Sequence, residues 1–384
     1  MAAQCNAAFD AIAEALGDFT CQNAPAILHL RNPFALSNWT LPVLELMMVA
    51  GAVLALLYSI RRLRRDGDPV NLALWFATVL YLFVIEIPLY FPNIFGVEES
   101  LGVVFVHNAF TVQFLFERLP LYIVALYPAV VTLAYEIVRS LGVFRDRGIV
   151  VGALCVGFVH HCLYEVFDQL GPQLRWWQWN TDNAINRPML ASVPMTSVWI
   201  FAALGPVVVT LLVFFFVGRD GQRRSVSLAL RTVVAGILTP IGIAVLSLPS
   251  SIFSGKVTAQ AIVFSVELVV VTVVAVPVLV TQWTRVRRED DALQSDFVRL
   301  FGPIYLGVLA VLWISALPDY FRAVDGVTRD GTPTGSLLYA TASFVVAALC
   351  IVAVVSARHG IEKGPENVDS LVRGLEGPEM SGVE

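Results

Sequence analysis

Long apolar segments recur along the chain and are separated by short polar connections. A helix needs about 20 apolar residues to cross the hydrocarbon core of a bilayer, and nine segments reach or approach that length. They cover residues 41–60, 71–92, 114–139, 149–169, 194–217, 226–247, 258–283, 298–317 and 336–356. A β-barrel would need short alternating segments, which the sequence lacks. The pattern therefore predicts an all-α, polytopic transmembrane helical bundle of about nine spans.

The composition supports a membrane protein. Hydrophobic residues make up 57% of the chain, charged residues only 14%, and the mean hydropathy is +0.73. These values lie far from those of soluble domains. The net charge is −5, and no basic patch is interleaved with aromatic residues, so no nucleic-acid partner is expected. The expected partners are the lipid bilayer and a membrane lipid or isoprenoid small molecule; the sequence leaves the oligomeric state open.

Basic residues gather in every second connection. Cytoplasmic loops are enriched in Lys and Arg, so the N-terminus is predicted outside and the C-terminus in the cytoplasm of a cell with this protein in its plasma (cytoplasmic) membrane. The chain then divides into an extracytoplasmic segment 1–40, a transmembrane domain 41–356 and a cytoplasmic tail 357–384, whose Gly, Glu and Pro content predicts disorder. The basic connections contain Arg61, Arg62, Arg64, Arg65, Arg145, Arg147, Arg219, Arg223, Arg224, Arg285, Arg287, Arg288 and Arg358.

Two cysteines, Cys5 and Cys21, fall in the predicted outer segment. Oxidation is possible on that side of the membrane, so the sequence predicts a disulfide between them.

The fourth span ends in an unusual run of ionisable residues. His161, Glu165 and Asp168 follow one another at i, i+4 and i+7, which places them on one face of a helix. Ionisable groups inside a membrane are costly, so they mark a functional site by default. The alternative is that His160 and His161 are core histidines bonded to backbone carbonyls.

The Gly171-Pro172 pair is expected to end this helix, because proline cannot continue it. Aromatic residues follow at the predicted membrane surface, where they form either an interfacial belt or the wall of a binding pocket. This stretch contains Arg175, Trp176, Trp177 and Trp179.

The alternating span directions place further polar residues at the same outer end of the membrane. Glu86 lies late in the second span, and Glu117 with Arg118 is expected to open the third. Glu45 is interpreted as a surface residue at a helix start, and Glu136 with Arg139 as an interfacial ion pair near the inner end. The outer group also includes His107, Asn108, Thr196, Ser197 and Trp199.

Histidine and carboxylates on one helix face can bind a metal, as in di-metal bundles. No matching His-containing motif appears on a second span. The sequence therefore predicts neither a metal nor another cofactor.

Short motifs between about residues 82 and 217 follow a recognisable order. An acid near a span end precedes a Gly-rich aromatic loop and a Pro-containing span that ends in Tyr-Pro. An Asp, a Pro, a Trp-x-Trp tract and a Pro shortly before another Trp come later. The matching residues are Glu86, Pro120, Tyr127-Pro128, Asp168, Pro172, Trp177-Gln178-Trp179, Pro194 and Trp199. This order resembles the integral-membrane carotenoid biosynthesis proteins, the carotenoid hydratase family. The chain departs from the pattern after Pro194, where Thr196 and Ser197 replace an expected Asn.

The resemblance implies addition of water across a trisubstituted isoprenoid double bond. Such a reaction needs an acid that protonates the alkene, aromatic faces that stabilise the cation and a base that deprotonates the attacking water. The expected acid is Asp168 or Glu86 and the base Glu165 or His161. Glu117 and Arg118 complete the catalytic candidates, and the expected substrate contacts are Trp177, Trp179, Trp199, His107, Asn108 and Arg175.

Two other classes of function fit the same residues. The acids could relay protons in a proton-coupled transporter, or the outer loops could form the docking face of a non-catalytic, lipid-binding membrane scaffold. Transport favours charges at the midplane and on both sides, whereas these acids cluster near one face.

Overall fold

The computed structural model describes residues 6–17, 19–20, 24–218, 225–289 and 293–357. Within these ranges nine helices are long and apolar enough to cross a membrane, so the predicted multi-pass helical bundle is confirmed. The Cys5–Cys21 disulfide and the tail from residue 358 lie outside the described residues. The spans are α2 (Thr40–Asp66), α3 (Val70–Tyr90), α5 (Leu121–Ser140), α6 (Val143–Leu170), η3 (Ser197–Leu204) continued by α7 (Gly205–Phe216), α8 (Ser225–Leu246), α10 (Val257–Glu289), α11 (Asp296–Arg322) and α12 (Leu337–Val355).

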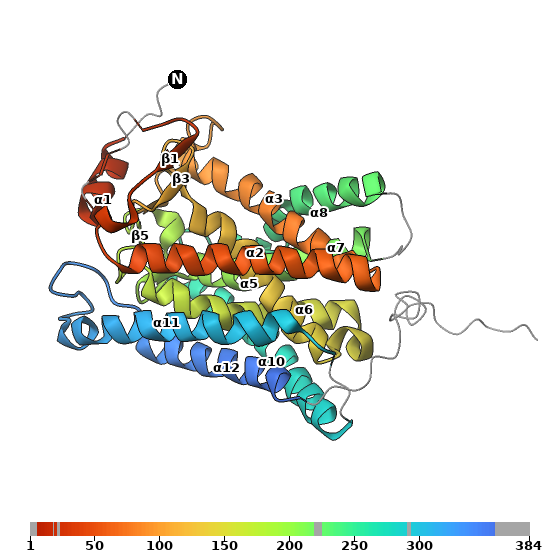
Figure 1. The fold of residues 1–384 in the computed structure, drawn as a ribbon. Coiled ribbons are helices and arrows are strands. Elements are labelled where there is room, and N and C mark those ends of the chain that lie inside the picture. The colour runs from red at the N-terminus through yellow and green to blue at the C-terminus, as the bar shows by residue number, and fades with distance from the viewer. Residues whose placement is uncertain (1–5, 18, 21–23, 219–224, 290–292, 358–384) are drawn as a thin grey trace, which may run out of the picture.

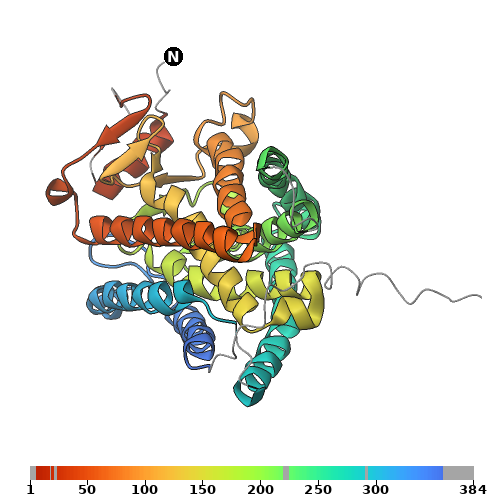
Figure 2. The same ribbon diagram turned by 45° about the vertical axis from the view of Figure 1, so that its right-hand side comes forward.

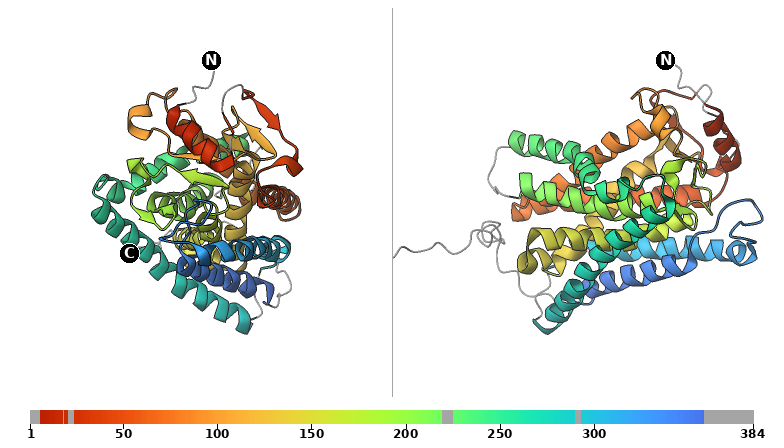
Figure 3. Two further views of the ribbon diagram at one scale, coloured as in Figure 1. Left: turned by 90° about the vertical axis from the view of Figure 1, so that its left-hand side faces the viewer. Right: turned by 180° about the vertical axis from the view of Figure 1, so that it is seen from behind.

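Helix α5 lies at the centre of the bundle and is buried along most of its length. Helices α2, α3 and α6 pack directly against it (Figures 1 and 2). Helix α10 crosses α6 obliquely and leaves most of its surface uncovered (Figure 3). Its exposed side chains are mainly apolar, such as Val269 and Val273, as expected for a helix that faces lipid.

The start of the fourth span agrees with its predicted position. The helix α6 contains a break at Gly148, whose φ of 78° is outside the helical region. Glycine adopts this conformation without a steric penalty. The helical segment after the break therefore begins at Ile149, the residue at which the sequence predicts the fourth span to start.

The start of the third span differs from its prediction. The helix begins at Leu121 rather than at residue 114, because Leu115, Phe116 and Glu117 have φ values of 54°, 56° and 61°. Three successive left-handed residues cannot belong to a right-handed helix. The prediction that Glu117 and Arg118 open this span is therefore wrong; both lie in a loop.

Short strands cover one end of the bundle, at the left in Figure 1. The strands β1 (Leu28–Leu30), β3 (Val112–Phe114) and β4 (Leu119–Pro120) form an antiparallel sheet, and β6 (Met189–Leu190) pairs with β7 (Val193–Pro194). The strand β2 (Phe105–His107) pairs with β5 (Trp177–Trp179). The helix α1 (Ala7–Gly17) packs on β2. The short helices are η1 (Pro33–Ala35), α4 (Glu98–Leu101), η2 (Ala184–Asn186) and α9 (Leu248–Ser251).

A buried ion pair ties three helices together at the opposite end. Glu136 of α5 is fully buried and accepts hydrogen bonds from Arg139 Nε and Nη2, both at 2.8 Å. It also accepts from the Tyr58 hydroxyl at 2.7 Å and from Asn71 Nδ2 at 2.7 Å. Tyr58 belongs to α2 and Asn71 to α3. The predicted ion pair between Glu136 and Arg139 is present, but it lies in the protein interior. The Glu136 carboxylate accepts all four of these hydrogen bonds.

Removing one partner of this pair should destabilise the fold strongly. We expect Arg139→Met to lower the free energy of unfolding by about 3–5 kcal/mol, because Glu136 is left buried without its counter-ion. The double variant Glu136→Met/Arg139→Met should recover part of this loss. Thermal unfolding in detergent micelles measures both effects. A double variant that is less stable than Arg139→Met would contradict this account of the pair.

Candidate functional site

Two acids from different helices line one small cavity at the strand-covered end. Glu86 of α3 and Asp168 of α6 face this space of about 30 Å³, which we call the inner cavity. The structure therefore brings together two of the acids that the sequence places at the same membrane end. The remaining lining is almost entirely aromatic: Phe105, His107, Tyr164, Phe167, Trp177, Trp179 and Phe201, with Ile123.

Glu86 is held by one tyrosine hydroxyl. The Tyr127 hydroxyl donates to Oε1 at 2.9 Å, whereas Oε2 has no hydrogen-bond partner among the described residues. Tyr127 comes from the middle of α5, so the central helix fixes the position of Glu86. Buried carboxyls need such partners, because an unpaired polar group in an apolar interior costs free energy.

Asp168 has one occupied oxygen and one without a hydrogen bond. Ser197 Oγ donates to Oδ2 at 2.8 Å, whereas Oδ1 has no hydrogen-bond partner among the described residues. The side chain is 0% exposed. Ser197 begins η3, so this element supplies the hydroxyl donor to Asp168.

The pairing of β2 with β5 builds the aromatic wall. It places Phe105 opposite Trp179 and His107 opposite Trp177, with ring centroids 5.4 and 6.2 Å apart. Trp177 and Trp179 are only 3% and 8% exposed, which argues against an interfacial belt. Aromatic faces attract cations, and more strongly when water is excluded.

The π-helix η3 borders the inner cavity through Phe201. Pro206 lacks the N–H that would bond the Ala202 carbonyl in an α-helix. His160 Nδ1 lies 2.7 Å from that carbonyl oxygen and donates to it. His160 is thus a core histidine, as one alternative predicted, and it helps to hold the π-helix, a structure frequent at functional sites. Trp199 of η3 is buried but does not line the inner cavity.

His161 and Glu165 form a second polar group on the side of α6 that faces α12. His161 Nε2 lies 2.8 Å from the Tyr339 hydroxyl, and His161 Nδ1 lies 3.8 Å from Glu165 Oε1. Gln169 Nε2 donates to Glu165 Oε2 at 3.2 Å. Neither His161 nor Glu165 lines the inner cavity, although Glu165 interacts electrostatically with Asp168. Tyr339 was not among the predicted site residues; the available signal was a single tyrosine in a mostly aliphatic span.

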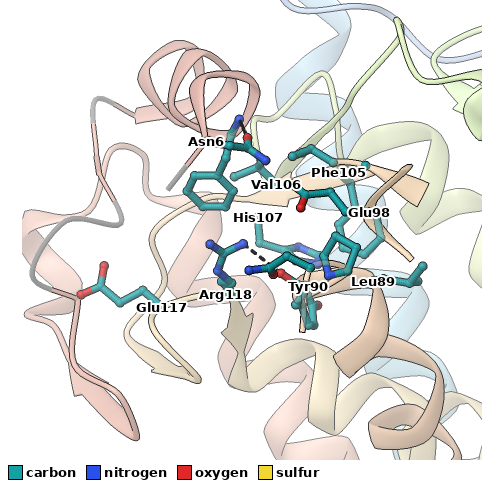
Figure 4. A pocket seen from close by; sticks show the side chains of 14 residues that line it. Asn6, Leu89, Tyr90, Glu98, Phe105, Val106, His107, Glu117 and Arg118 are labelled. Atoms are coloured by element: carbon teal, nitrogen blue, oxygen red, sulfur yellow. Dashed lines mark hydrogen bonds between the residues drawn. The ribbon is translucent and has the colours of Figure 1, made fainter. Parts of the chain in front are cut away.

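Glu117 and Arg118 lie outside the inner cavity and have different surroundings (Figure 4). The Glu117 carboxylate accepts hydrogen bonds from His29 Nδ1 and Arg31 Nη2. These bonds connect the loop that contains Glu117 to β1 and to the residue that follows it. Arg118 Nη1 donates to the Tyr90 carbonyl at 2.9 Å, and its guanidinium lies 4.6 Å from the Phe9 ring centroid. Burial lowers the pKa of Arg118, and the nearby Asp10 acts in the opposite direction.

Three further residues of the outer group have structural contacts. Glu45 is 5% exposed and contacts Thr111 and Val112, so its interpretation as a surface residue is wrong. The loop between β2 and β3 covers it. Asn108 Nδ2 donates to the carbonyls of Leu16 and Arg175 at 3.3 and 2.7 Å. Arg175 Nη2 donates to the Asp330 carbonyl at 2.7 Å. Neither Asn108 nor Arg175 lines the inner cavity.

Among the residues that the structure describes, no group of three or more His, Cys, Asp or Glu side chains is arranged to hold a metal ion. Comparisons with protein-family models, curated proteins and solved structures found no match. The resemblance to carotenoid hydratases therefore stays a prediction.

Gly171 allows Trp177 to enter the cavity wall. A Cβ at this position would lie 2.0 Å from Trp177 Cη2, a severe overlap. We expect Gly171→Ala to push the indole away and to destabilise the protein by about 1–3 kcal/mol, as overpacking does.

Gly307 of α11 is the matched control, since nothing lies within 4 Å of its added Cβ. Gly307→Ala should leave stability unchanged or raise it slightly, because alanine favours helix. Thermal unfolding and tryptophan fluorescence check both variants. Equal behaviour of the two would contradict the tight packing of Trp177 on Gly171.

Proposed function

We propose that the protein is a membrane enzyme that adds water to a trisubstituted double bond of an isoprenoid. The observation that carries this proposal is the meeting of Glu86 and Asp168, from two helices, in one aromatic cavity within a membrane bundle. The motif order that resembles carotenoid hydratases supports the same chemistry and includes both acids, Trp177 and Trp179.

Asp168 is the proposed acid: Ser197 fixes its Oδ2, and its Oδ1, like Oε2 of Glu86, has no hydrogen-bond partner among the described residues and can carry the proton. The protonated carboxyl transfers its proton to the less substituted alkene carbon, and the π bond becomes a new C–H bond. A tertiary cation remains, which the faces of Trp177 and Trp179 stabilise. Water then forms a C–O bond, and its surplus proton returns to Asp168. The sum is alkene plus water giving a tertiary alcohol.

The alkene reaches the site from the lipid in this proposal. The inner cavity has room for about one water molecule, so an isoprenoid end needs a side chain to move. Phe201 is the candidate, since it lines the cavity and is only partly buried on η3. A membrane-dissolved substrate then reaches the acids without entering water.

The contacts at the opposite end of the bundle favour an enzyme over a proton-coupled transporter. A relay would need a carboxyl able to exchange protons near that face. Glu136 is instead saturated by Arg139, Tyr58 and Asn71. We therefore assign Glu136 a structural role.

Substitution of Asp168 tests the proposal. We expect Asp168→Asn to reduce alcohol formation by about 100-fold or more, the usual contribution of a general acid. Purified protein in liposomes is given squalene or lycopene, acyclic isoprenoids with trisubstituted terminal double bonds, and products are measured by mass spectrometry.

Glu45→Gln is the matched control, because Glu45 is a buried acid at the same end of the bundle that does not line the inner cavity. It should retain turnover within about threefold, since its carboxyl takes no part in the proton transfer. Full turnover by Asp168→Asn would rule out the assigned acid.

We also propose that the strand-covered end faces outward and that the protein lies in the plasma membrane. Arginines gather at the other end, on α2, α6 and α10, and such clusters favour the cytoplasm. Alkaline phosphatase fused after Glu384 in a bacterial host should be inactive, and green fluorescent protein fused there should fluoresce. An active phosphatase fusion would place the C-terminus outside and contradict the proposed orientation. The arginines that α2, α6 and α10 contribute to this end are Arg61, Arg62, Arg64, Arg65, Arg145, Arg147, Arg285, Arg287 and Arg288.

A further inference from the structure

A larger cavity lies at the strand-covered end of the bundle (Figure 4) and shares lining residues with the inner cavity. It measures about 200 Å³, and we call it the outer cavity. Its rim includes the exposed residues Asn93 and Glu98, so it opens toward the aqueous side of the bundle end. Phe105 and His107 of β2 line both cavities and form the boundary between them.

The two cavities differ in what they can hold. The outer cavity is lined by polar groups such as Asn6, Asn93 and Arg118 as well as apolar ones, and its volume accommodates several water molecules. The inner cavity accommodates about one. A polar and roomy space hydrates readily, whereas an apolar one of the same size stays dry.

His107 is firmly held at the boundary. Its Nδ1 lies 2.9 Å from the Tyr122 hydroxyl. In the pairing of β2 with β5, His107 lies opposite Trp177. Burial lowers the pKa of His107 to about 3, so the imidazole is neutral at neutral pH. Its other nitrogen, Nε2, has no hydrogen-bond partner within the described part of the chain. A neutral ring with a free nitrogen can bond one water molecule without introducing a charge.

We propose that the outer cavity is the water entrance of the site and that His107 is the residue that positions the attacking water. This inference rests on the proposed hydration: the alkene comes from the lipid, whereas water comes from the aqueous side past β2. We assign His107 the tautomer in which Nδ1–H donates to the Tyr122 oxygen, so that Nε2 accepts a hydrogen bond from the water. The water oxygen is thereby turned toward the inner cavity. His107 is a positioning residue, since the proton released after C–O bond formation goes to the Asp168 carboxylate.

The first experiment tests access and is independent of any turnover. Val103 lines the outer cavity, and Val103→Cys in a Cys5→Ser/Cys21→Ser background introduces a thiol there. The remaining cysteines, Cys155, Cys162 and Cys350, are buried. A charged, water-soluble methanethiosulfonate should modify the new thiol rapidly. Val269→Cys, exposed on α10 where lipid is expected, is the control and should react at least about tenfold more slowly because the reagent does not enter lipid. Equal rates would overturn the water entrance.

The second experiment tests His107 itself. In D2O, return of the cation to alkene leaves deuterium in recovered lycopene, while capture by water gives the tertiary alcohol. We expect His107→Phe, which keeps a ring, to lower the ratio of alcohol to deuterated alkene by at least about tenfold. Without the imidazole, the water molecule is not held in position to attack, and it captures the cation more slowly. His107→Gln keeps a hydrogen-bond acceptor and should recover much of the ratio.

The outcomes separate the two proposals. An unchanged ratio in His107→Phe, with both products reduced together, assigns His107 a merely structural role and overturns this inference. A wild-type protein that forms neither product contradicts the proposed hydration itself, and the positioning role fails with it. Modification of Val103→Cys would in that case still show an aqueous outer cavity.

Discussion

The antiparallel pairing of β2 with β5 is the interaction on which the candidate site depends. The two strands come from different connections, one before α5 and one after α6, and their backbone groups satisfy each other over the end of the bundle. Their register decides which rings face the inner cavity: His107 opposite Trp177 and Phe105 opposite Trp179. A shift by one residue would turn these side chains to the other face of the pair.

The two ends of the bundle differ in how many hydrogen-bond donors surround a buried carboxyl. At one end Glu136 meets a guanidinium, a hydroxyl and an amide, and its contacts join α2, α3 and α5. At the strand-covered end Asp168 has a single hydroxyl donor and aromatic neighbours. A saturated carboxyl stabilises the fold, whereas a carboxyl with an unoccupied oxygen beside a cavity is available for proton transfer.

The sequence predicts the spans well because long apolar runs have few structural alternatives in a membrane. Span direction also places Glu86 and Asp168 at one end, and the structure adds that they face the same cavity. The predicted start of the third span is wrong because most of residues 112–116 are apolar and resemble the beginning of a membrane-spanning helix. Hydropathy carries no information about the left-handed backbone at Leu115–Glu117. Ser197, Tyr127 and Tyr339 were not predictable as partners, since each contacts a residue on another helix. Glu45 was misjudged for a similar reason: the segment that covers it lies more than sixty residues away along the chain.

Incorporation of isotopic oxygen tests the central claim most directly, namely that the cavity between Glu86 and Asp168 catalyses addition of water to an isoprenoid alkene. Purified protein in liposomes is incubated with lycopene in H2 18O, and the extracted isoprenoids are analysed by mass spectrometry. The account predicts a tertiary alcohol that carries one heavy oxygen for each double bond hydrated. Recovery of lycopene without any labelled alcohol, from protein that is folded and correctly inserted, would contradict it.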